Sequence, residues 1–215
     1  MSYPFQADAR THASTVGLIL LLTLALLWVL GTWPALLLGG LALCITLLTW
    51  RALPREVPAQ SGAVLSPADG RVVKIEKARD PYAHRDALRI SVFMNLFDTQ
   101  GNRASVDGVV QQVQYFPGHL LSTDLDTGSR RNERNAIVID SHGQTVTLVQ
   151  SAGLIARRIL CHVKPGDRIA RGQRFGLIRF GSRVDVYLPP HAVPKVAPGE
   201  KVSATTTILA TLVAA

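Results

Sequence analysis

Gly181 and Ser182 are the two residues whose chemistry says most about this chain. A serine hydroxyl can attack the carbonyl of the residue before it if the turn is strained, which converts the amide into an ester. Elimination from that ester splits the chain and leaves a dehydroalanine, which hydrolyses to a pyruvoyl group, a ketone that can act as an electron sink. A Gly-Ser pair alone more often marks a turn. The surrounding sequence has to decide between the two interpretations.

Other residues that could move protons or bind anions lie in short blocks along the chain. Asp69 follows Ser-Pro-Ala, where an Asp-Gly pair usually forms a hairpin turn but could supply a carboxylate base. His119 follows Tyr-Phe-Pro-Gly and titrates near neutral pH. Guanidinium groups offer paired donors to phosphate and carboxylate, and a solvated arginine is the alternative at each position. The candidate arginines are Arg103, Arg134, Arg157 and Arg158. The remaining histidines show no metal-site spacing.

Residues 61–215 are expected to form one domain that is mainly β. Short β-branched runs recur between Gly, Pro and Asp turns, as in antiparallel sheets. The runs are Arg71–Glu76, Leu88–Met94, Val106–Tyr115, Ala136–Asp140, Thr145–Gln150, Phe175–Phe180, Arg183–Leu188 and Val202–Leu212. The segments Leu120–Asp126 and Gly153–Ile159 stay ambiguous between helix and loop. The turns in Ser66–Val73 and Val163–Gln173 resemble those of lipoyl- and biotinyl-type domains, which predicts a hybrid barrel or β-sandwich.

The N-terminal region predicts a transmembrane helical hairpin. An uncharged, Leu- and Ala-rich run extends from Gly17 to Trp50, longer than the ~20 residues of a single span. Gly31 and Pro34 interrupt this run and favour a turn. The hairpin would return both arginine-bearing flanks to the cytoplasmic side of the inner (cell) membrane. The expected division is a tail at 1–16, the hairpin at 17–50, a linker at 51–60 and the domain at 61–215.

The chain is strongly basic, with a formal net charge of +8. Asp8 and Arg10 are the only charged residues before position 51, so the whole excess belongs to residues 51–215. Such a surface attracts anionic phospholipid headgroups. No nucleic-acid-binding module is recognisable, which argues against a nucleic-acid partner.

Seven blocks, in a fixed order, resemble the sequence of a known enzyme family. They are Ser66–Gly70, Ser91–Met94, Asn102–Arg103, Tyr115–Gly118, Asn132–Asn135, Ala152–Ile159 and Phe180–Arg183. Together they resemble the short, single-domain (archaeal-type) pyruvoyl form of phosphatidylserine decarboxylase. The resemblance covers nearly everything after residue 60.

The resemblance implies a membrane-associated carboxy-lyase that converts phosphatidylserine to phosphatidylethanolamine. It implies self-cleavage between Gly181 and Ser182, a pyruvoyl group derived from Ser182, and a Schiff-base intermediate, with neither a metal nor pyridoxal phosphate. The two cleavage chains would stay together as a heterodimer, and a higher oligomer is left open. Asp69 would orient or activate the cleavage machinery. The expected substrate-binding residues are Gln100, Asn102, Arg103, Arg134 and Arg158.

Gln100 departs from the family pattern, because short-form relatives usually carry a histidine at this position. A glutamine amide does not titrate near neutral pH and cannot replace a general acid or base. His119 is the candidate substitute. Because of this departure, a second interpretation stays open: the chain is a degenerate relative that binds lipid without cleaving itself. A third interpretation is a hybrid-barrel carrier or binding module. Such a module would need a modifiable lysine exposed at a hairpin tip, and no lysine has a sequence context that predicts this position.

Overall fold

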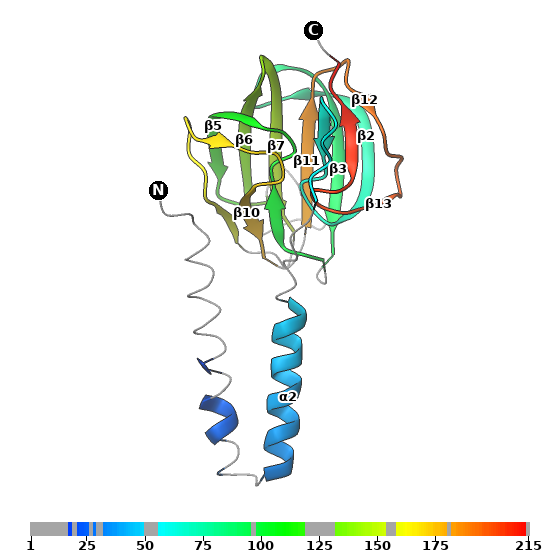
Figure 1. Cartoon of the computed structure of the whole chain (residues 1–215). Coiled ribbons are helices and arrows are strands. Elements are labelled where there is room, and N and C mark those ends of the chain that lie inside the picture. Colours follow the sequence, from blue (N-terminus) through cyan, green and yellow to red (C-terminus); the bar gives the residue numbers. More distant parts are fainter. Residues whose placement is uncertain are drawn as a thin grey trace. The chain divides into compact units, whose positions relative to one another are not determined.

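The computed structural model describes residues 17–18, 21–25, 28, 32–49, 56–95, 98–118, 132–153, 158–179 and 182–213. The chain divides into two compact units, Met1–Leu53 and Pro54–Ala215. Every described strand belongs to the second unit (Figure 1).

Helix α2 (Thr32–Thr49) is 18 residues long. Pro34 lies in its first turn, the part of a helix that tolerates proline. No helix in the described part of the chain is both long and apolar enough to cross a membrane. The predicted transmembrane hairpin over 17–50 is therefore wrong.

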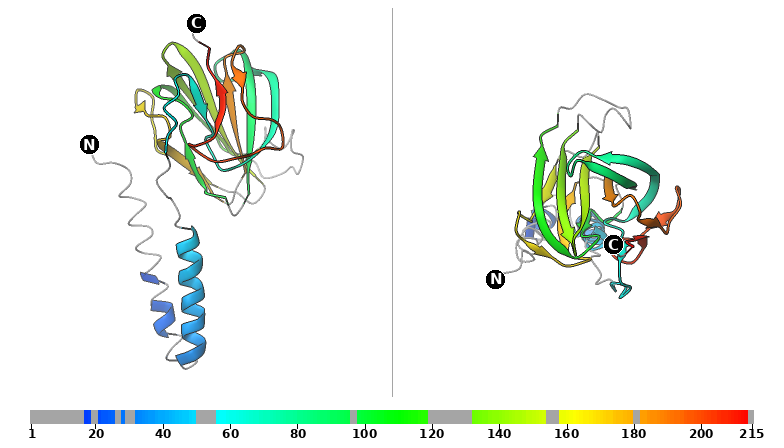
Figure 2. Two further views of the ribbon diagram at one scale, coloured as in Figure 1. Left: turned by 45° about the vertical axis from the view of Figure 1, so that its right-hand side comes forward. Right: turned by 90° about the horizontal axis from the view of Figure 1, so that it is seen from above.

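The β unit is built on one curled antiparallel sheet of eight strands (Figure 2). Its order is β13 (Lys201–Val202), β2 (Gly70–Asp80), β3 (Arg85–Met94), β11 (Ser182–Leu188), β7 (Gln144–Ala152), β6 (Arg134–Ser141), β5 (Gly108–Phe116) and β9 (Arg168–Ile169). One three-stranded sheet has the order β4 (Gly101–Arg103), β10 (Arg174–Ile178) and β8 (Ile159–Cys161). The other has the order β1 (Ala63–Leu65), β14 (Ile208–Thr211) and β12 (Val193–Pro194).

The mainly β expectation is confirmed, but the predicted lipoyl/biotinyl-type hybrid barrel does not describe this arrangement. Eight strands form a single continuous sheet, because β11 pairs with β3 on one side and β7 on the other. The turns that suggested the barrel are local features, and local turns do not determine which distant strands pair. The run expected at 202–212 is also two strands, β13 and β14, separated by a turn.

Strand β11 shows why the sheet buries both of its faces. Val184, Val186 and Leu188 alternate along it, are fully buried, and join the main hydrophobic core. Tyr187 points to the opposite face, as the period of two requires. There it belongs to a second apolar cluster that includes Val149 of β7.

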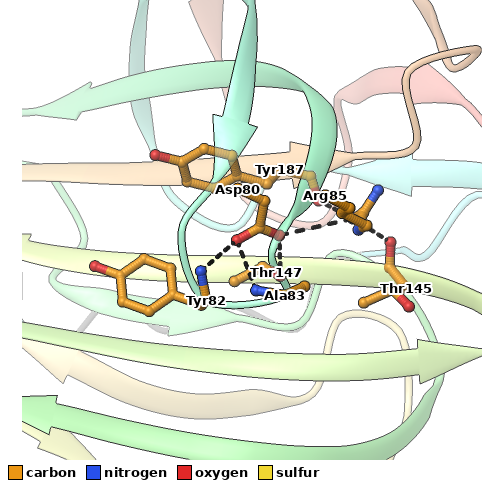
Figure 3. A network of polar contacts seen from close by, with 7 residues as sticks. All are labelled: Asp80, Tyr82, Ala83, Arg85, Thr145, Thr147 and Tyr187. Carbon is orange, nitrogen blue, oxygen red and sulfur yellow. Dashed lines mark hydrogen bonds and ion pairs between the residues drawn. The ribbon is translucent and has the colours of Figure 1, made fainter.

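A buried carboxylate closes the β2–β3 hairpin (Figure 3). Asp80 is fully buried, and its Oδ1 accepts hydrogen bonds from the backbone N–H of Tyr82 at 3.0 Å and Ala83 at 3.2 Å. Its Oδ2 accepts a hydrogen bond from the Thr147 hydroxyl at 2.7 Å and faces Arg85 Nη2 at 3.8 Å. The carboxylate therefore joins the hairpin turn to strand β7.

Arg85 adds a second connection between the hairpin and strand β7. Arg85 Nη2 donates a hydrogen bond to the Thr145 carbonyl at 2.6 Å. Burial lowers the pKa of the Arg85 guanidinium, and the Asp80 carboxylate opposes that shift. Because each charge offsets the desolvation of the other, removing one leaves a buried charge without compensation.

We expect Asp80→Ala to lower the free energy of unfolding by about 3 kcal/mol, the usual cost of breaking a buried ion pair. Urea unfolding measures this loss through the transition midpoint. Asp86→Ala is the matched control, because Asp86 lies on the same hairpin but is exposed, and it should change stability by less than about 0.5 kcal/mol. Equal midpoints for the two variants would contradict a stabilising role for the Asp80 network.

Candidate functional site

Ser182 is the first residue of β11, the central strand of the large sheet. Its backbone pairs with Met94 at the end of β3 and with Ala152 at the end of β7. Gly181 and His119, the predicted partners in cleavage and proton transfer, lie outside the described residues. The predicted nucleophile therefore lies at the edge of the core, where three strands end together.

The described segments before and after the Gly181–Ser182 bond belong to two different sheets. Upstream, β10 pairs with β4 and β8, and the N–H of Arg179 donates to the carbonyl of Arg158 at 3.1 Å. Downstream, β11 pairs with β3 and β7. Each flank thus has its own hydrogen-bonded support.

Asp69 lies at the start of β2, on the far side of β3 from Ser182. Its Oδ1 accepts a hydrogen bond from the backbone N–H of Ala204 at 2.8 Å. Gly70 follows, and a Cβ built there would lie 2.0 Å from the carbonyl oxygen of Phe93. The sheet order β2-β3-β11 places Asp69 two strands from Ser182, and at ~4.8 Å per strand this is about 10 Å.

Strand β4 joins the Asn-Arg block to the Ser-Pro-Ala-Asp-Gly block. The backbone N–H of Arg103 donates to the carbonyl of Pro67 at 2.8 Å. The Arg103 guanidinium donates to the carbonyl of Gly172 at 2.9 Å. Asn102 is fully buried, so in this structure its side chain belongs to the interior. Substrate-binding roles for Asn102 and Arg103 stay predictions.

Three buried amides form a hydrogen-bonded chain beneath the start of β11. Asn135 Nδ2 donates to Gln150 Oε1 at 3.0 Å, and Gln150 Nε2 donates to Asn102 Oδ1 at 2.7 Å. Asn102 Nδ2 then donates to the sulfur of Met94 at 3.4 Å. The sequence did not single out Gln150, although it holds a polar side chain at a core position of the alternating strand β7. That break in the apolar pattern was the available signal.

Gln100, where the resemblance leads us to expect a histidine, stabilises the loop in front of β4. Its Nε2 donates to the carbonyl of Asp98 at 2.9 Å and to that of Asn95 at 3.4 Å. Its own carbonyl accepts a hydrogen bond from the N–H of Ile178 at 3.1 Å. Gln100 therefore contacts the end of β10, close to the link that carries the Gly-Ser pair.

Glu133, which sequence reasoning did not assign a role, connects three of the blocks. Its Oε1 accepts hydrogen bonds from the hydroxyl of Tyr115 and from the N–H of Ile159, both at 3.0 Å. Its carbonyl accepts a hydrogen bond from the N–H of Ala152 at 2.9 Å. Desolvation and the Glu133 carboxylate raise the pKa of Tyr115, and the positive charge of Arg158 opposes that shift.

The predicted arginines differ in their surroundings. The Arg134 guanidinium lies over the Phe116 ring, 5.0 Å from its centroid, and Arg158 is exposed. Arg157 lies outside the described residues. Arg134 and Arg158 thus remain candidates for binding an anionic headgroup.

The tertiary structure brings most of the sequence blocks to the start of β11. Residues 92–94, 152 and 182 meet by strand pairing, residues 69–70 adjoin β3, and residues 102 and 135 reach the same region through the amide chain. Among the residues that the structure describes, no group of three His, Cys, Asp or Glu side chains could hold a metal ion.

Comparisons with known proteins agree with this arrangement. The family model described as phosphatidylserine decarboxylase matches residues 45–210. The phosphatidylserine decarboxylase proenzyme of Ralstonia nicotianae is 56% identical over 98% of both chains. The proteins of the same name from Cupriavidus pinatubonensis and Polynucleobacter asymbioticus are 55% and 50% identical, over 99% of this chain and 98% of each relative. Assignment to the archaeal-type short form stays a prediction.

We expect Gly70→Ala to lower the free energy of unfolding by about 3 kcal/mol, because the added methyl group would collide with the Phe93 carbonyl and push β2 away from β3. Gly143→Ala is the matched control: Gly143 also has a positive φ, +80°, but open space around its Cβ position, so only backbone strain of about 1 kcal/mol applies. Urea unfolding distinguishes the two. Equal losses would argue against close packing of β2 on β3.

Proposed function

Because the chain belongs to the phosphatidylserine decarboxylase family, we propose that it removes carbon dioxide from the serine headgroup of phosphatidylserine and yields phosphatidylethanolamine. We propose further that it is made as a precursor, splits itself between Gly181 and Ser182, and uses a pyruvoyl group formed from Ser182. The relatives are known as proenzymes, which supports the precursor step.

The observation that carries this proposal is the position of the Gly181–Ser182 peptide between two sheets. A break in the middle of a paired strand would interrupt the backbone of a strand that is hydrogen-bonded to its neighbours. Here the upstream chain is paired through Ile178 in β10, and the downstream chain is paired from Ser182 onward in β11. Scission at Ser182 therefore leaves the strand pairings of β10 and those of β11 from Arg183 onward in place.

The chemistry of scission needs a hydroxyl, a carbonyl and proton transfers. Ser182 Oγ attacks the Gly181 carbonyl carbon, and the amide C–N bond breaks as the C–O ester bond forms. Removal of the Ser182 α-proton then expels the Gly181 carboxylate and leaves dehydroalanine. Addition of water releases ammonia and leaves the ketone. Asp69 is the candidate that orients this machinery, from its position at the start of β2.

The residues around Ser182 fit such a group. Residue 182 begins a strand that is paired on both sides, with Met94 and Ala152, so a new chain end there would stay fixed after scission. When present, the pyruvoyl ketone supplies the electron sink for decarboxylation. Arg134 and Arg158 are proposed to hold the phosphate and carboxylate of the substrate, with Gln100, Asn102 and Arg103 as further binding residues.

We also propose that the enzyme acts at the cytoplasmic face of the cell membrane. The substrate is a membrane lipid, and the net charge of +8 favours attraction to anionic headgroups. After scission the two chains would remain associated as a heterodimer, since β11 pairs on both sides with strands of the longer chain.

A second candidate function is a relative that binds lipid but does not process itself. Gln100 favours it, because an amide cannot transfer the proton that a histidine would. In the structure Gln100 Nε2 donates to two loop carbonyls, which suits a positioning role. The intact Gly-Ser pair at the sheet junction favours the enzyme.

The purified protein is expected to consist of two chains separated between Gly181 and Ser182. Intact mass spectrometry measures both chains, and the shorter should have a blocked N-terminus that reacts with a carbonyl reagent. Ser182→Ala should abolish both splitting and decarboxylation, because it lacks the attacking oxygen. Ser203→Ala, which alters an exposed turn serine, is the control and should split normally. A wild-type protein that is folded and active but not split would contradict this mechanism.

The substitute for the missing histidine can be found by comparing three variants. If His119 transfers the proton, His119→Ala should slow decarboxylation by on the order of 10² to 10⁴, and Gln100→Ala should cost less. Product release from a serine phospholipid measures the rate, after equal chain splitting has been confirmed in each variant. A gain of activity in Gln100→His, together with no loss in His119→Ala, would show instead that position 100 has lost its acid.

A further inference from the structure

The buried amide chain Asn135–Gln150–Asn102 lies within a largely apolar core. Each of the three side chains is at most 1% exposed. Their neighbours in the core include Val184 and Leu148, both fully buried. Buried amides contribute little net stability, since each bond replaces one to water, whereas an unpaired buried amide is costly. Net stability alone therefore gives no reason for three linked amides here.

The path of this chain through the fold suggests another reason. It starts on β6 at Asn135, crosses to Gln150 on β7, continues to Asn102 on β4, and ends at Met94 on β3. Strands β7 and β3 are the two neighbours of β11. The amide chain thus connects the two strands that flank β11 without using β11 itself.

The connection lies at the level of the cleavage site. Met94, its last member, pairs directly with Ser182. Gln150 pairs with Val184, two residues further along β11. The separation of the strands on either side of Ser182 is therefore set in part by hydrogen bonds of defined length and direction.

Strand β10, which leads into the cleavage link, packs against the same amide. A Cβ built at Gly176 would lie 3.1 Å from Gln150 Nε2 and 2.3 Å from the carbonyl of Leu160. The side chain of Gln150 thus occupies the space that a larger residue on β10 would need. Gln150 thus adjoins β10 through its side chain and β11 through the pairing of its backbone with Val184.

We propose that Gln150 is a positioning residue for self-cleavage, acting through the amide chain to hold the β3 and β7 edges that fix Ser182 against the end of β10. This inference rests on the proposed self-cleavage. Loss of the chain should displace the reacting hydroxyl and carbonyl, and a misplacement of about 1 Å can slow a reaction on the order of 10²-fold.

The test follows splitting of newly synthesised full-length chain in a cell-free reaction with detergent micelles, sampled over time on gels. Gln150→Leu removes both hydrogen bonds and should slow splitting on the order of 10²-fold. Thr147→Val is the matched control, because Thr147 is a fully buried residue of the same strand whose hydroxyl bonds to Asp80 instead. It should lower stability but leave the splitting rate within about two-fold of the wild type. Each rate is measured well below that variant's own unfolding temperature.

Gln150→Glu supplies a readout that a loss of stability alone would not give. A neutral glutamic acid can accept from Asn135 and donate to Asn102, as glutamine does, whereas the carboxylate can only accept. Burial raises the pKa of such a carboxyl. Splitting of Gln150→Glu relative to wild type should therefore increase as the pH falls, and should recover to within about ten-fold at the lowest pH at which the protein stays folded.

The outcomes separate this inference from the proposed function. If the wild type does not split, self-cleavage itself fails. If the wild type splits and both Gln150 variants split at its rate, the positioning role is overturned. Equal slowing in Thr147→Val, or a Gln150→Glu rate that shows no recovery at low pH, would likewise overturn it, since general destabilisation would then explain the effect.

Discussion

The pairing of β11 with β3 on one side and β7 on the other is the constraint on which the site depends. Val184, Val186 and Leu188 face the core from this strand, while Asp185 and Tyr187 face the other side. A slip of one residue would exchange these two sets, placing a carboxylate in the aliphatic core. The register is therefore strongly fixed, and with it the position of Ser182 opposite Met94 and Ala152.

Two polar networks hold the opposite ends of these same strands, and they differ in charge. At the Tyr187 end, Asp80 and Arg85 form a buried ionic network in which each charge offsets the desolvation of the other. At the Ser182 end, the amide chain through Gln150 carries no charge. For the proposed cleavage, a neutral network could orient the reacting groups without adding a fixed charge near them.

The link between β10 and β11 would reconcile a stable fold with the proposed self-cleavage. Self-cleavage needs a peptide bond that can distort, whereas a sheet holds its peptides in regular geometry. Locating the bond between two sheets separates these demands, since the strands on either side keep their hydrogen bonds. Glu133 and Gln100 add support from outside the strands, because each fixes a segment that adjoins this link.

The sequence by itself determined the mainly β character and most strand positions, because alternation and turn residues are local features, and the chemistry that it suggests at Gly181–Ser182 stays a prediction. It could not determine that β11 lies between β3 and β7, nor that Gln150 and Glu133 reach the site, because these depend on pairing between residues far apart in the chain, such as Ser182 and Met94. It also misled at the N-terminus, where an apolar run suggested a membrane hairpin, but no helix in the described part of the chain is long and apolar enough to cross a membrane. Composition gives the hydrophobicity of a segment. The length of a helix and the partner of a strand depend instead on backbone hydrogen bonds, which form only in the folded chain.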